Sequence, residues 1–309
     1  MSFHVYAVVV TFNRKDLLRK CMQSLLAQTL RPDSVLVVDN ASTDGTIKML
    51  EDLAQLHPEI VRYERLPKNL GGAGGFSHGL ASALALGADW VWMMDDDAEP
   101  EPDALRSLLA EHPSPANVHA SVPHRGGILA WPVRWLDESG RRANLATQLD
   151  QLPERCQVQN HPFLGFMIHR DLVSRIGLPD AQLFISADDI EYSLRARSSG
   201  ADIVLIRASR ISHPISTVRH RTLLGLRIAL ISLPPWRRYY DTRNRLLVAR
   251  RHHGYRFWTQ ALPGTLIRML LIMLYEPNKL AQIKATGAGL LDGLRNLSGI
   301  RHDKWHLGK

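Results

Sequence analysis

The chain contains only two cysteines, Cys21 and Cys156, among its 309 residues. Two cysteines exclude a cysteine-rich metal cluster and a small fold held by disulfides, and they fit a reducing compartment. The start of the chain also lacks a basic segment followed by a long apolar stretch, so we expect no secretory signal and a cytoplasmic protein. The length and the hydrophobic content of 45% suit one large α/β domain with a smaller appendage.

Acidic residues are scarce towards the C-terminus. Residues 205–309 contain 19 Lys and Arg but only 4 Asp and Glu, whereas the rest of the chain carries 19 basic and 26 acidic residues. A strongly basic segment predicts an anionic partner, and nucleic acid and an anionic membrane surface are the two candidates. We expect a domain over residues 1–215 that carries the chemistry and a basic, amphipathic helical region over residues 216–309.

Patterns typical of buried strands alternate with helical patterns in the first hundred residues. A β-branched apolar run such as Val5–Thr11 predicts a strand that is buried on both faces. Alternation of such strands with helices indicates an α/β fold with a mostly parallel sheet and right-handed crossovers. The predicted strands are Val5–Thr11, Ser34–Asp39, Ile60–Arg65 and Asp89–Met94.

The remainder of the chain is less regular. Residues 112–162 are rich in Pro, Gly and polar residues and give no clear pattern. Phe163–His169 and Ile203–Ile206 predict two further strands, and a helix is expected to start near Asp188. From Thr222 onward the pattern predicts helices.

Three clusters of polar residues follow predicted strands at their carboxyl ends. Ligands of parallel sheets bind beyond these ends, so we expect the clusters to lie on one rim. A carboxylate at Asp39 could accept a hydrogen bond from a base N–H or a ribose hydroxyl, and it could equally cap the next helix. The three clusters are Thr11–Arg14, Asp39–Asn40 and Asp95–Asp97.

The run Asp95-Asp96-Asp97 directly follows an apolar strand. Adjacent carboxylates repel one another unless a cation neutralises them. Alternate residues of an extended chain point the same way, so Asp95 and Asp97 could both reach one metal ion. Oxygen ligands suit Mg²⁺ or Mn²⁺, which keep coordination positions open for substrate phosphates. The alternative is a solvated acidic turn.

Residues 68–76 are rich in glycine and predict a loop before a helix that ends near Leu86. Glycine lets backbone N–H groups approach an anion or a sugar, and the N-terminus of a helix favours negative charge. The spacing matches neither the P-loop nor the dinucleotide-binding pattern. A tight turn without a ligand remains the alternative.

Asp188, Asp189 and Glu191 open a predicted helix. Carboxylates at a helix start are stabilised by the helix dipole, which is a purely structural explanation. The functional interpretation is a general base that accepts the proton of an attacking hydroxyl. His213 could supply an imidazole to the same metal ion, although a lone histidine is more often structural.

The segment Phe257–Tyr275 is strongly apolar, but Pro263, Gly264 and Arg268 interrupt it. Its longest uninterrupted part is far shorter than the roughly 20 residues that a membrane span needs. A buried helix and an interfacial helix both remain open. Aromatic and basic side chains alternate over residues 236–245, and this mixture suits a lipid headgroup layer.

In their order along the chain, these motifs resemble glycosyltransferase family 2. The pieces that carry the resemblance are Thr11–Arg14, Val37–Thr46, Asp95–Asp97 and Asp188–Glu191. Two fuller pieces, Asn69–Phe76 and Trp90–Pro100, are similar to a branch that contains bacterial rhamnosyltransferases and galactofuranosyltransferases. The resemblance covers roughly residues 3–215. It implies a GT-A fold and a metal-dependent, inverting sugar transfer from a nucleotide-diphospho-sugar donor.

The resemblance also implies roles for individual residues. Asp189 would be the catalytic base, and Glu191 would orient it or bind the acceptor. Asp97 would bind Mn²⁺ or Mg²⁺, with Asp95 as a second candidate and His213 at the position of a metal-binding histidine. Further acceptor candidates are Asp188, Trp236 and Tyr240. Nucleotide and donor contacts are implied for Thr11, Asn13, Arg14, Asp39, Asn69, Gly71, Gly72, Asp95 and Asp96.

The implied acceptor is a lipopolysaccharide-core or other lipid-linked cell-surface glycan, which would place the basic tail on the inner face of the plasma membrane. L-Rhamnose from dTDP-rhamnose is favoured over galactofuranose from UDP-galactofuranose, because a short chain without a further C-terminal module is similar to the lipopolysaccharide-core enzymes. A nucleic-acid-binding protein is disfavoured because no recognition motif is present and the acidic run stays unexplained. An inactive scaffold is disfavoured because metal, base and loop residues are all present.

Overall fold

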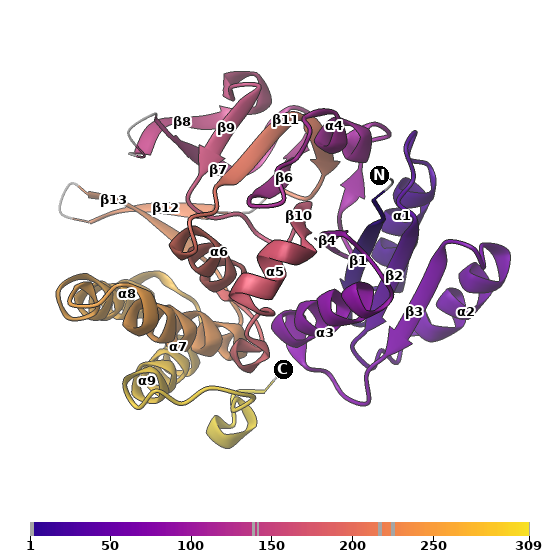
Figure 1. Ribbon diagram of the computed structural model, residues 1–309. Helices are drawn as coiled ribbons and strands as arrows, with labels where there is room; N and C mark the ends of the chain where they lie inside the picture. Colours follow the sequence, from indigo (N-terminus) through magenta and orange to yellow (C-terminus); the bar gives the residue numbers. More distant parts are fainter. Residues whose placement is uncertain (1–2, 138–139, 141, 216–217, 224–225, 309) are drawn as a thin grey trace. The chain divides into compact units, whose positions relative to one another are not determined.

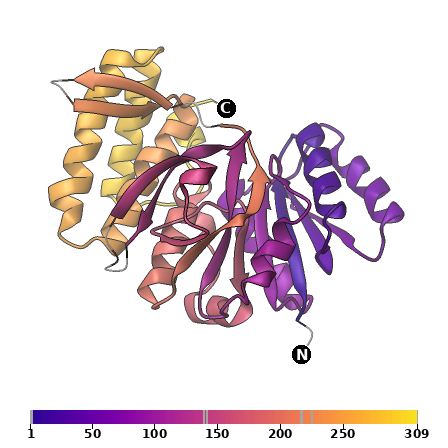
Figure 2. The ribbon, with the colours of Figure 1, turned by 90° about the horizontal axis from the view of Figure 1, so that it is seen from above.

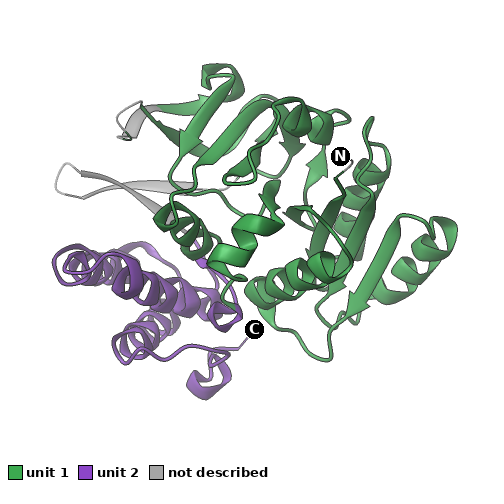
Figure 3. Ribbon diagram, viewed as in Figure 1, with its two compact units in different colours: residues 1–180, 189–215 green, residues 181–188, 216–309 purple. Residues whose placement is uncertain are grey.

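The computed structural model describes residues 3–137, 140, 142–215, 218–223 and 226–308 (Figure 1). The chain divides into two compact units (Figure 3). Unit 1 contains residues 1–180 and 189–215, and unit 2 contains residues 181–188 and 216–309. The division is discontinuous in sequence, because the short segment 181–188 belongs to unit 2 while the residues on both sides of it belong to unit 1.

The core of unit 1 is a mixed sheet whose first half is parallel. Because β1 pairs in parallel with both β2 and β4, and β2 with β3, the carboxyl ends of these strands lie along one edge. The four strands are β1 (Val5–Thr11), β2 (Ser34–Asp39), β3 (Val61–Arg65) and β4 (Trp90–Asp95). The predicted α/β architecture is therefore confirmed.

The second half of the sheet is built largely from residues whose sequence gave no clear pattern. β10 pairs antiparallel with β4 and β6, and β6 pairs in parallel with β11. β11 is longer than the predicted strand at residues 203–206. The remaining strands are β5 (Glu99–Pro100), β6 (Val118–Arg125), β7 (Ile128–Leu136), β8 (Arg142–Gln148), β9 (Arg155–Val158), β10 (Phe166–His169) and β11 (Ile203–Ser212).

Helices cover both faces of this sheet (Figures 1 and 2). Successive residues of β1 serve opposite faces: Val8 and Val10 pack in one apolar cluster, and Ala7 and Val9 pack in the other. The first cluster includes α3 (Gly71–Ala85), α5 (Arg170–Ile176) and α6 (Asp188–Ser198). The second includes α1 (Lys15–Leu26), α2 (Thr46–Leu56) and α4 (Ala104–Ala110).

The glycine-rich segment is helical rather than a loop, so that part of the prediction is wrong. α3 begins at Gly71, and its glycines bring it close to the sheet. A Cβ atom on Gly75 would lie 2.4 Å from Val10 Cγ1, and one on Gly79 would lie 2.5 Å from Val8 Cγ1. These two glycines therefore serve close helix–strand packing, which the sequence pattern alone does not distinguish from ligand binding.

Unit 2 contains a hairpin and three longer helices. The hairpin strands β12 (Val218–Leu223) and β13 (Leu226–Ile231) contradict the helix predicted from Thr222 onward, because a short apolar run does not separate strand from helix. The helices are α7 (Pro235–His252), α8 (Leu262–Tyr275) and α9 (Lys279–Leu294), and a π-helical turn, η3 (Phe257–Ala261), leads into α8. Phe257–Tyr275 is long and apolar enough to cross a membrane by length and composition.

Candidate functional site

The polar residues at the ends of β1, β2 and β4 lie together, as predicted. Thr11 is paired with Asp39 in the register of β1 and β2, and Val10 is paired with Asp95 in that of β1 and β4. Side-chain hydrogen bonds then join the residues that follow these strands. The parallel sheet thus gathers three distant sequence motifs on one edge.

Asp96 is the buried centre of this edge. Only 3% of its surface is exposed, and it accepts hydrogen bonds from Thr11 Oγ1 at 2.7 Å and Arg14 at 3.2 Å. Burial raises the pKa of Asp96, and the charge of Arg14 and the Thr11 hydrogen bond oppose that rise. Thr11 and Arg14, predicted to hold nucleotide, are here partners of a protein carboxylate.

Asp97 faces both a cation and an imidazole. Arg14 donates to its Oδ2 at 3.1 Å, and its Oδ1 lies 3.4 Å from His213 Nε2. Burial opposes the ionisation of Asp97, but the contacts with His213 and Arg14 outweigh it and lower the pKa of this carboxyl. β4 ends at Asp95, and the chain turns at the next two residues. The prediction that Asp95 and Asp97 point the same way along an extended chain is therefore wrong.

The residues at this edge fit a divalent cation. Within the described part of the chain, no group of three or more His, Cys, Asp or Glu side chains is assembled as a metal site. Buried atoms of Asp97 (Oδ1) and His213 (Nδ1) nevertheless have no hydrogen-bond partner. One carboxylate and one imidazole would leave most coordination positions for phosphate oxygens, which is the usual arrangement for Mg²⁺.

Asp39 presents a second unsatisfied acceptor. The residue is fully buried, and its Oδ1 accepts a hydrogen bond from the backbone N–H of Ser42 at 3.0 Å. Its Oδ2 has no hydrogen-bond partner and lies 3.6 Å from Arg65 Nε. The sequence did not single out Arg65, because its only signal was its place at the end of a predicted strand. Asp39 does not cap α2, whose N-cap is Gly45; one of its oxygens instead fixes the loop after β2. Its contact with a nucleoside stays a prediction.

Asn13 and Asn69 organise the neighbouring loops. Asn13 has a positive φ of 52° and accepts from the backbone N–H of Thr43 at 2.7 Å, which ties the end of β1 to the loop after β2. Asn69 accepts from the N–H of Gly71 at 2.7 Å. Gly72 has open space where a Cβ would stand. Gly71 is buried, and both its N–H and its C=O are hydrogen-bonded, so of these two glycines Gly72 is the one that a ligand could approach.

The acidic motif at α6 contains one buried ion pair. Glu191 is 3% exposed and pairs with Arg195 at 2.9 Å, and Arg195 also donates to the carbonyls of Ile176 and Leu178. Asp189 is more exposed, and its Oδ1 accepts from the N–H of Ile190 at 2.7 Å. Asp188, 8% exposed, is the last residue of the segment that belongs to unit 2.

Burial of the tyrosines in α7 contradicts one prediction. Tyr239 and Tyr240 are fully buried, so they are neither headgroup contacts nor, for Tyr240, a direct acceptor contact. The Tyr240 hydroxyl is hydrogen-bonded to His302 Nδ1 at 2.8 Å, and Tyr239 donates to Asp292 at 2.7 Å. Trp236 is half-buried and packs edge-on against Tyr240. Four of the aromatic and basic residues over 236–245, namely Arg238, Tyr239, Tyr240 and Arg243, lie in the interior of unit 2, whereas Arg245 is exposed.

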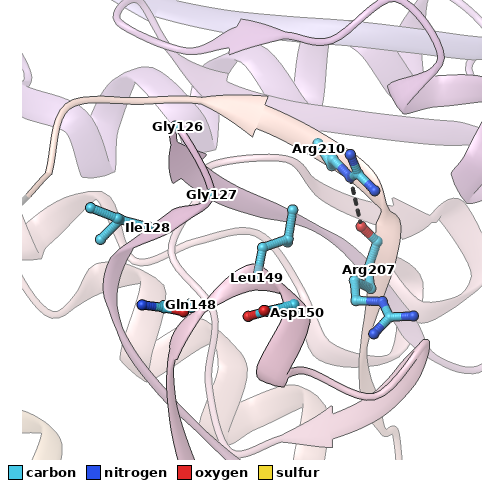
Figure 4. A pocket seen from close by; sticks show the side chains of 8 residues that line it. All are labelled: Gly126, Gly127, Ile128, Gln148, Leu149, Asp150, Arg207 and Arg210. Atoms are coloured by element: carbon cyan, nitrogen blue, oxygen red, sulfur yellow. Dashed lines mark hydrogen bonds between the residues drawn. The ribbon is translucent and has the colours of Figure 1, made fainter.

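A cavity of about 580 Å³ lies elsewhere in unit 1, beside the turn between β6 and β7 (Figure 4). Two arginines of β11, Arg207 and Arg210, line one side, and Gly126 and Gly127 line another. None of the predicted site residues lines this cavity. The candidate site is therefore the edge at β1, β2 and β4, where Asp39, Asp97 and His213 each have a buried polar atom without a hydrogen-bond partner.

This chain is similar to glycosyltransferases in its sequence. A family model described as glycosyl transferase family 2 matches residues 6–177. The galactofuranosyltransferase GlfT1 of Mycolicibacterium smegmatis is 31% identical over 265 residues, which cover 81% of this chain and 82% of that protein. The dTDP-rhamnosyl transferase RfbF of Shigella flexneri is 25% identical over 308 residues, which cover 97% of this chain and 98% of that protein.

Solved structures agree on the architecture. The mannosyltransferase PcManGT of Pyrobaculum calidifontis, in complex with GDP-Man and Mn²⁺, matches with a TM-score of 0.54 at 16% identity. The match covers 95% of this chain and 87% of that one. At this identity the likeness shows the fold alone, and it confirms the predicted GT-A fold.

Proposed function

Because this chain belongs to glycosyl transferase family 2, we propose that it catalyses an inverting, metal-dependent sugar transfer to a hydroxyl of a lipid-linked glycan. The enzyme is a glycosyltransferase, and its donor is a nucleotide sugar. The observation that supports the mechanism is the cluster at the ends of β1 and β4. There Asp97 contacts both Arg14 and His213, and Asp97 and His213 each have a buried atom without a hydrogen-bond partner.

In this proposal Asp189 is the general base. Its carboxylate takes the proton of the acceptor hydroxyl while that oxygen attacks the anomeric carbon. The bond between the anomeric carbon and the diphosphate oxygen breaks on the opposite face, so the configuration inverts. A divalent cation held by Asp97 and His213 would neutralise the leaving diphosphate. Asp39 Oδ2 would accept from the nucleoside, and the backbone at Gly72 would lie against the donor.

For the sugar, we propose L-rhamnose from dTDP-rhamnose. The match to a dTDP-rhamnosyl transferase over nearly the full length of both proteins supports this donor, because it includes unit 2. A second candidate is galactofuranose from UDP-galactofuranose. It is supported by the higher identity to a galactofuranosyltransferase, although over a smaller share of both chains.

A screen of nucleotide sugars tests both donors. We expect dTDP-L-rhamnose with Mn²⁺ to be hydrolysed slowly and to raise the Tm by roughly 5 °C at a concentration of about 100 Kd. Free dTDP and a nucleotide hexose such as UDP-glucose serve as controls. A larger shift and faster hydrolysis with UDP-galactofuranose would favour the second donor, and no turnover of any nucleotide sugar would contradict the enzymatic proposal.

We further propose that the outward face of α8 contacts a membrane. Apart from Pro263 near its start and Tyr275 at its end, its exposed positions carry large aliphatic side chains, whereas the inward positions include the buried Thr265. A helix that faces water shows the opposite pattern, so this face is not suited to solvent. The exposed aliphatic side chains are Leu266, Ile267, Leu270, Met273 and Leu274.

Charges near this face favour anionic lipid over neutral lipid. Exposed Arg251 and Arg256 precede the apolar helix, and exposed Lys279 and Lys284 follow it. Trp258, 63% exposed, stands at its start. Cations and an indole beside an in-plane apolar face are the features of interfacial helices on anionic bilayers. The proposed location is therefore the inner face of the plasma membrane, where a lipid-linked acceptor is accessible.

Flotation with liposomes tests this surface. We expect the protein to float with vesicles of phosphatidylglycerol and phosphatidylcholine, and Leu270→Glu to lower binding at least 10-fold, because burying one leucine contributes about 1.5–3 kcal/mol. Leu56→Glu is the matched control, since Leu56 is 71% exposed on α2 of unit 1. Equal flotation with pure phosphatidylcholine would contradict the electrostatic part, and unchanged binding of Leu270→Glu would contradict the role of α8.

A further inference from the structure

The segment just before Asp189 has an unusual backbone. Phe184, Ser186 and Ala187 have φ values of 66°, 72° and 63°, in the left-handed region that L-residues with a Cβ rarely adopt. None of the three is a glycine, so the sequence itself does not favour this path. Such a conformation persists only where surrounding groups hold it. The segment lies in unit 2, and the chain enters unit 1 at Asp189.

A buried asparagine of α7, Asn244, is one of the groups that hold this backbone. Asn244 is fully buried, and its Nδ2 donates hydrogen bonds to the carbonyls of Leu183 at 2.9 Å, Ile185 at 2.9 Å and Ser186 at 2.8 Å. One side-chain amide thus gathers three carbonyls of a tight loop. Without this donor each of the three carbonyls would lose a hydrogen bond, which costs free energy where the group is shielded from water.

The neighbouring arginine holds both the segment and the asparagine. Arg243 is fully buried and donates to the carbonyls of Leu183 at 3.1 Å and Gln182 at 3.4 Å. Its Nε donates to Asn244 Oδ1 at 2.9 Å, which fixes the orientation of the amide. A fourth hydrogen bond, to the carbonyl of Gly299 at 2.5 Å, anchors the guanidinium itself. Because the amide oxygen accepts from Arg243, the amide nitrogen must face the loop.

From these contacts we infer that Arg243 and Asn244 are positioning residues for the base Asp189. They fix the carbonyls of residues 182, 183, 185 and 186, the left-handed backbone carries that constraint to Ala187, and α6 begins at the next residue. The direction of the Asp189 side chain follows from the path of this backbone. The inference rests on the proposed function, in which Asp189 takes the proton of the acceptor hydroxyl.

Asn244→Asp tests the inference with the smallest change of shape. The carboxylate still accepts from Arg243 Nε, but it has no N–H for the three loop carbonyls. We expect kcat to fall roughly 100-fold, as misplacement of a catalytic group by about 1 Å can cause. The Kd of the donor nucleotide with Mn²⁺ is expected to stay within about twofold, because the donor residues lie on other elements.

Tyr239→Phe is the matched control for stability. It removes a buried hydrogen bond of the same helix that goes to Asp292 rather than to residues 182–186. We expect a similar loss of Tm in both variants but a loss of kcat only in Asn244→Asp. If both variants lose kcat in proportion to their unfolded fraction, Asn244 stabilises the fold only and the inference is wrong.

A rescue experiment separates positioning from folding even if Asn244→Asp does not fold. Glycine adopts the left-handed conformation at little cost, so Ser186→Gly with Ala187→Gly should let the loop keep its path without its holder. In an Asn244→Ala background we expect these two changes to raise kcat at least 10-fold. No rescue, at equal folded fractions, would overturn the inference. If Asp189→Asn is active, the proposed base is wrong; if it is inactive while Asn244→Asp is fully active, only the positioning role is wrong.

Discussion

Replacing Asp189 with Asn is expected to lower turnover about 1000-fold while leaving donor binding nearly intact. The loss follows from the role of a general base, which typically contributes 10²–10⁴-fold. Asparagine has the same shape, and its Oδ1 can still accept from the N–H of Ile190 as the carboxylate does. The start of α6 should therefore keep its hydrogen bond, and the variant should fold. Steady-state kinetics with Mn²⁺ and donor calorimetry measure the two quantities separately.

Asp171→Asn is the matched control for this variant. Asp171 lies in the first turn of α5, and its exposed side chain lies 3.3 Å from His169. It tests what the loss of a carboxylate at a helix start does by itself. We expect normal turnover from it. Near-normal turnover of Asp189→Asn would remove Asp189 from the role of base, whatever its effect on stability.

Replacing Asp97 with Ala is expected to abolish the dependence of donor binding on Mn²⁺. Loss of a residue that only supports a metal ligand typically lowers affinity 10–100-fold, so loss of a ligand should cost about 100-fold or more. His213→Ala should act in the same direction, because its imidazole lies 3.4 Å from Asp97 Oδ1. Calorimetry with donor nucleotide in the presence and absence of Mn²⁺ measures the effect directly.

The control for the Asp97 and His213 variants removes one negative charge that is near Asp97 in the sequence and is not part of the cluster. Glu99→Gln does so, since Glu99 lies on β5 and pairs with Ser212 of β11 in the sheet register. We expect donor binding by Glu99→Gln to retain its full response to Mn²⁺. A double variant of Asp97 and His213 should lose little more than either single variant if both hold one ion. Additive losses would instead point to two independent contributions.

The parallel half of the sheet follows from the sequence because each strand carries its own signal. Val5–Thr11 and Ser34–Asp39 are apolar on both faces, which a central parallel strand requires. Strands β6 to β9 carry no such signal, since they are short, largely polar as in β8, or interrupted, for example by Pro123 in β6. Their pairing depends on partners far along the chain, and residue patterns do not reveal distant partners.

The sequence predicts which residue types form the site, but it does not predict the contacts between them. The positions of Asp95–Asp97 and Asp39 after buried strands predict a polar edge, and the structure has it. That Thr11 and Arg14 bind Asp96 depends on atomic distances, which no pattern contains. The positive φ values at Phe184 and Ala187 could not be foreseen either, because neither residue type favours them.

Residues 181–188 belong to unit 2, most of which is synthesised after them. The loop before Asp189 is therefore completed late in synthesis. When the ribosome has completed β11, Asp189 has already been synthesised. Residues 243 and 244, whose side chains bind the carbonyls that precede Asp189, have not yet been made. The sheet of unit 1 contains no strand beyond β11, but the loop at 182–187 lacks the side chains that hold its left-handed backbone until α7 has been made. Synthesis of α7 completes the loop. A chain ended at residue 215 would thus contain every carboxylate of the proposed site and lack the part that arranges one of them.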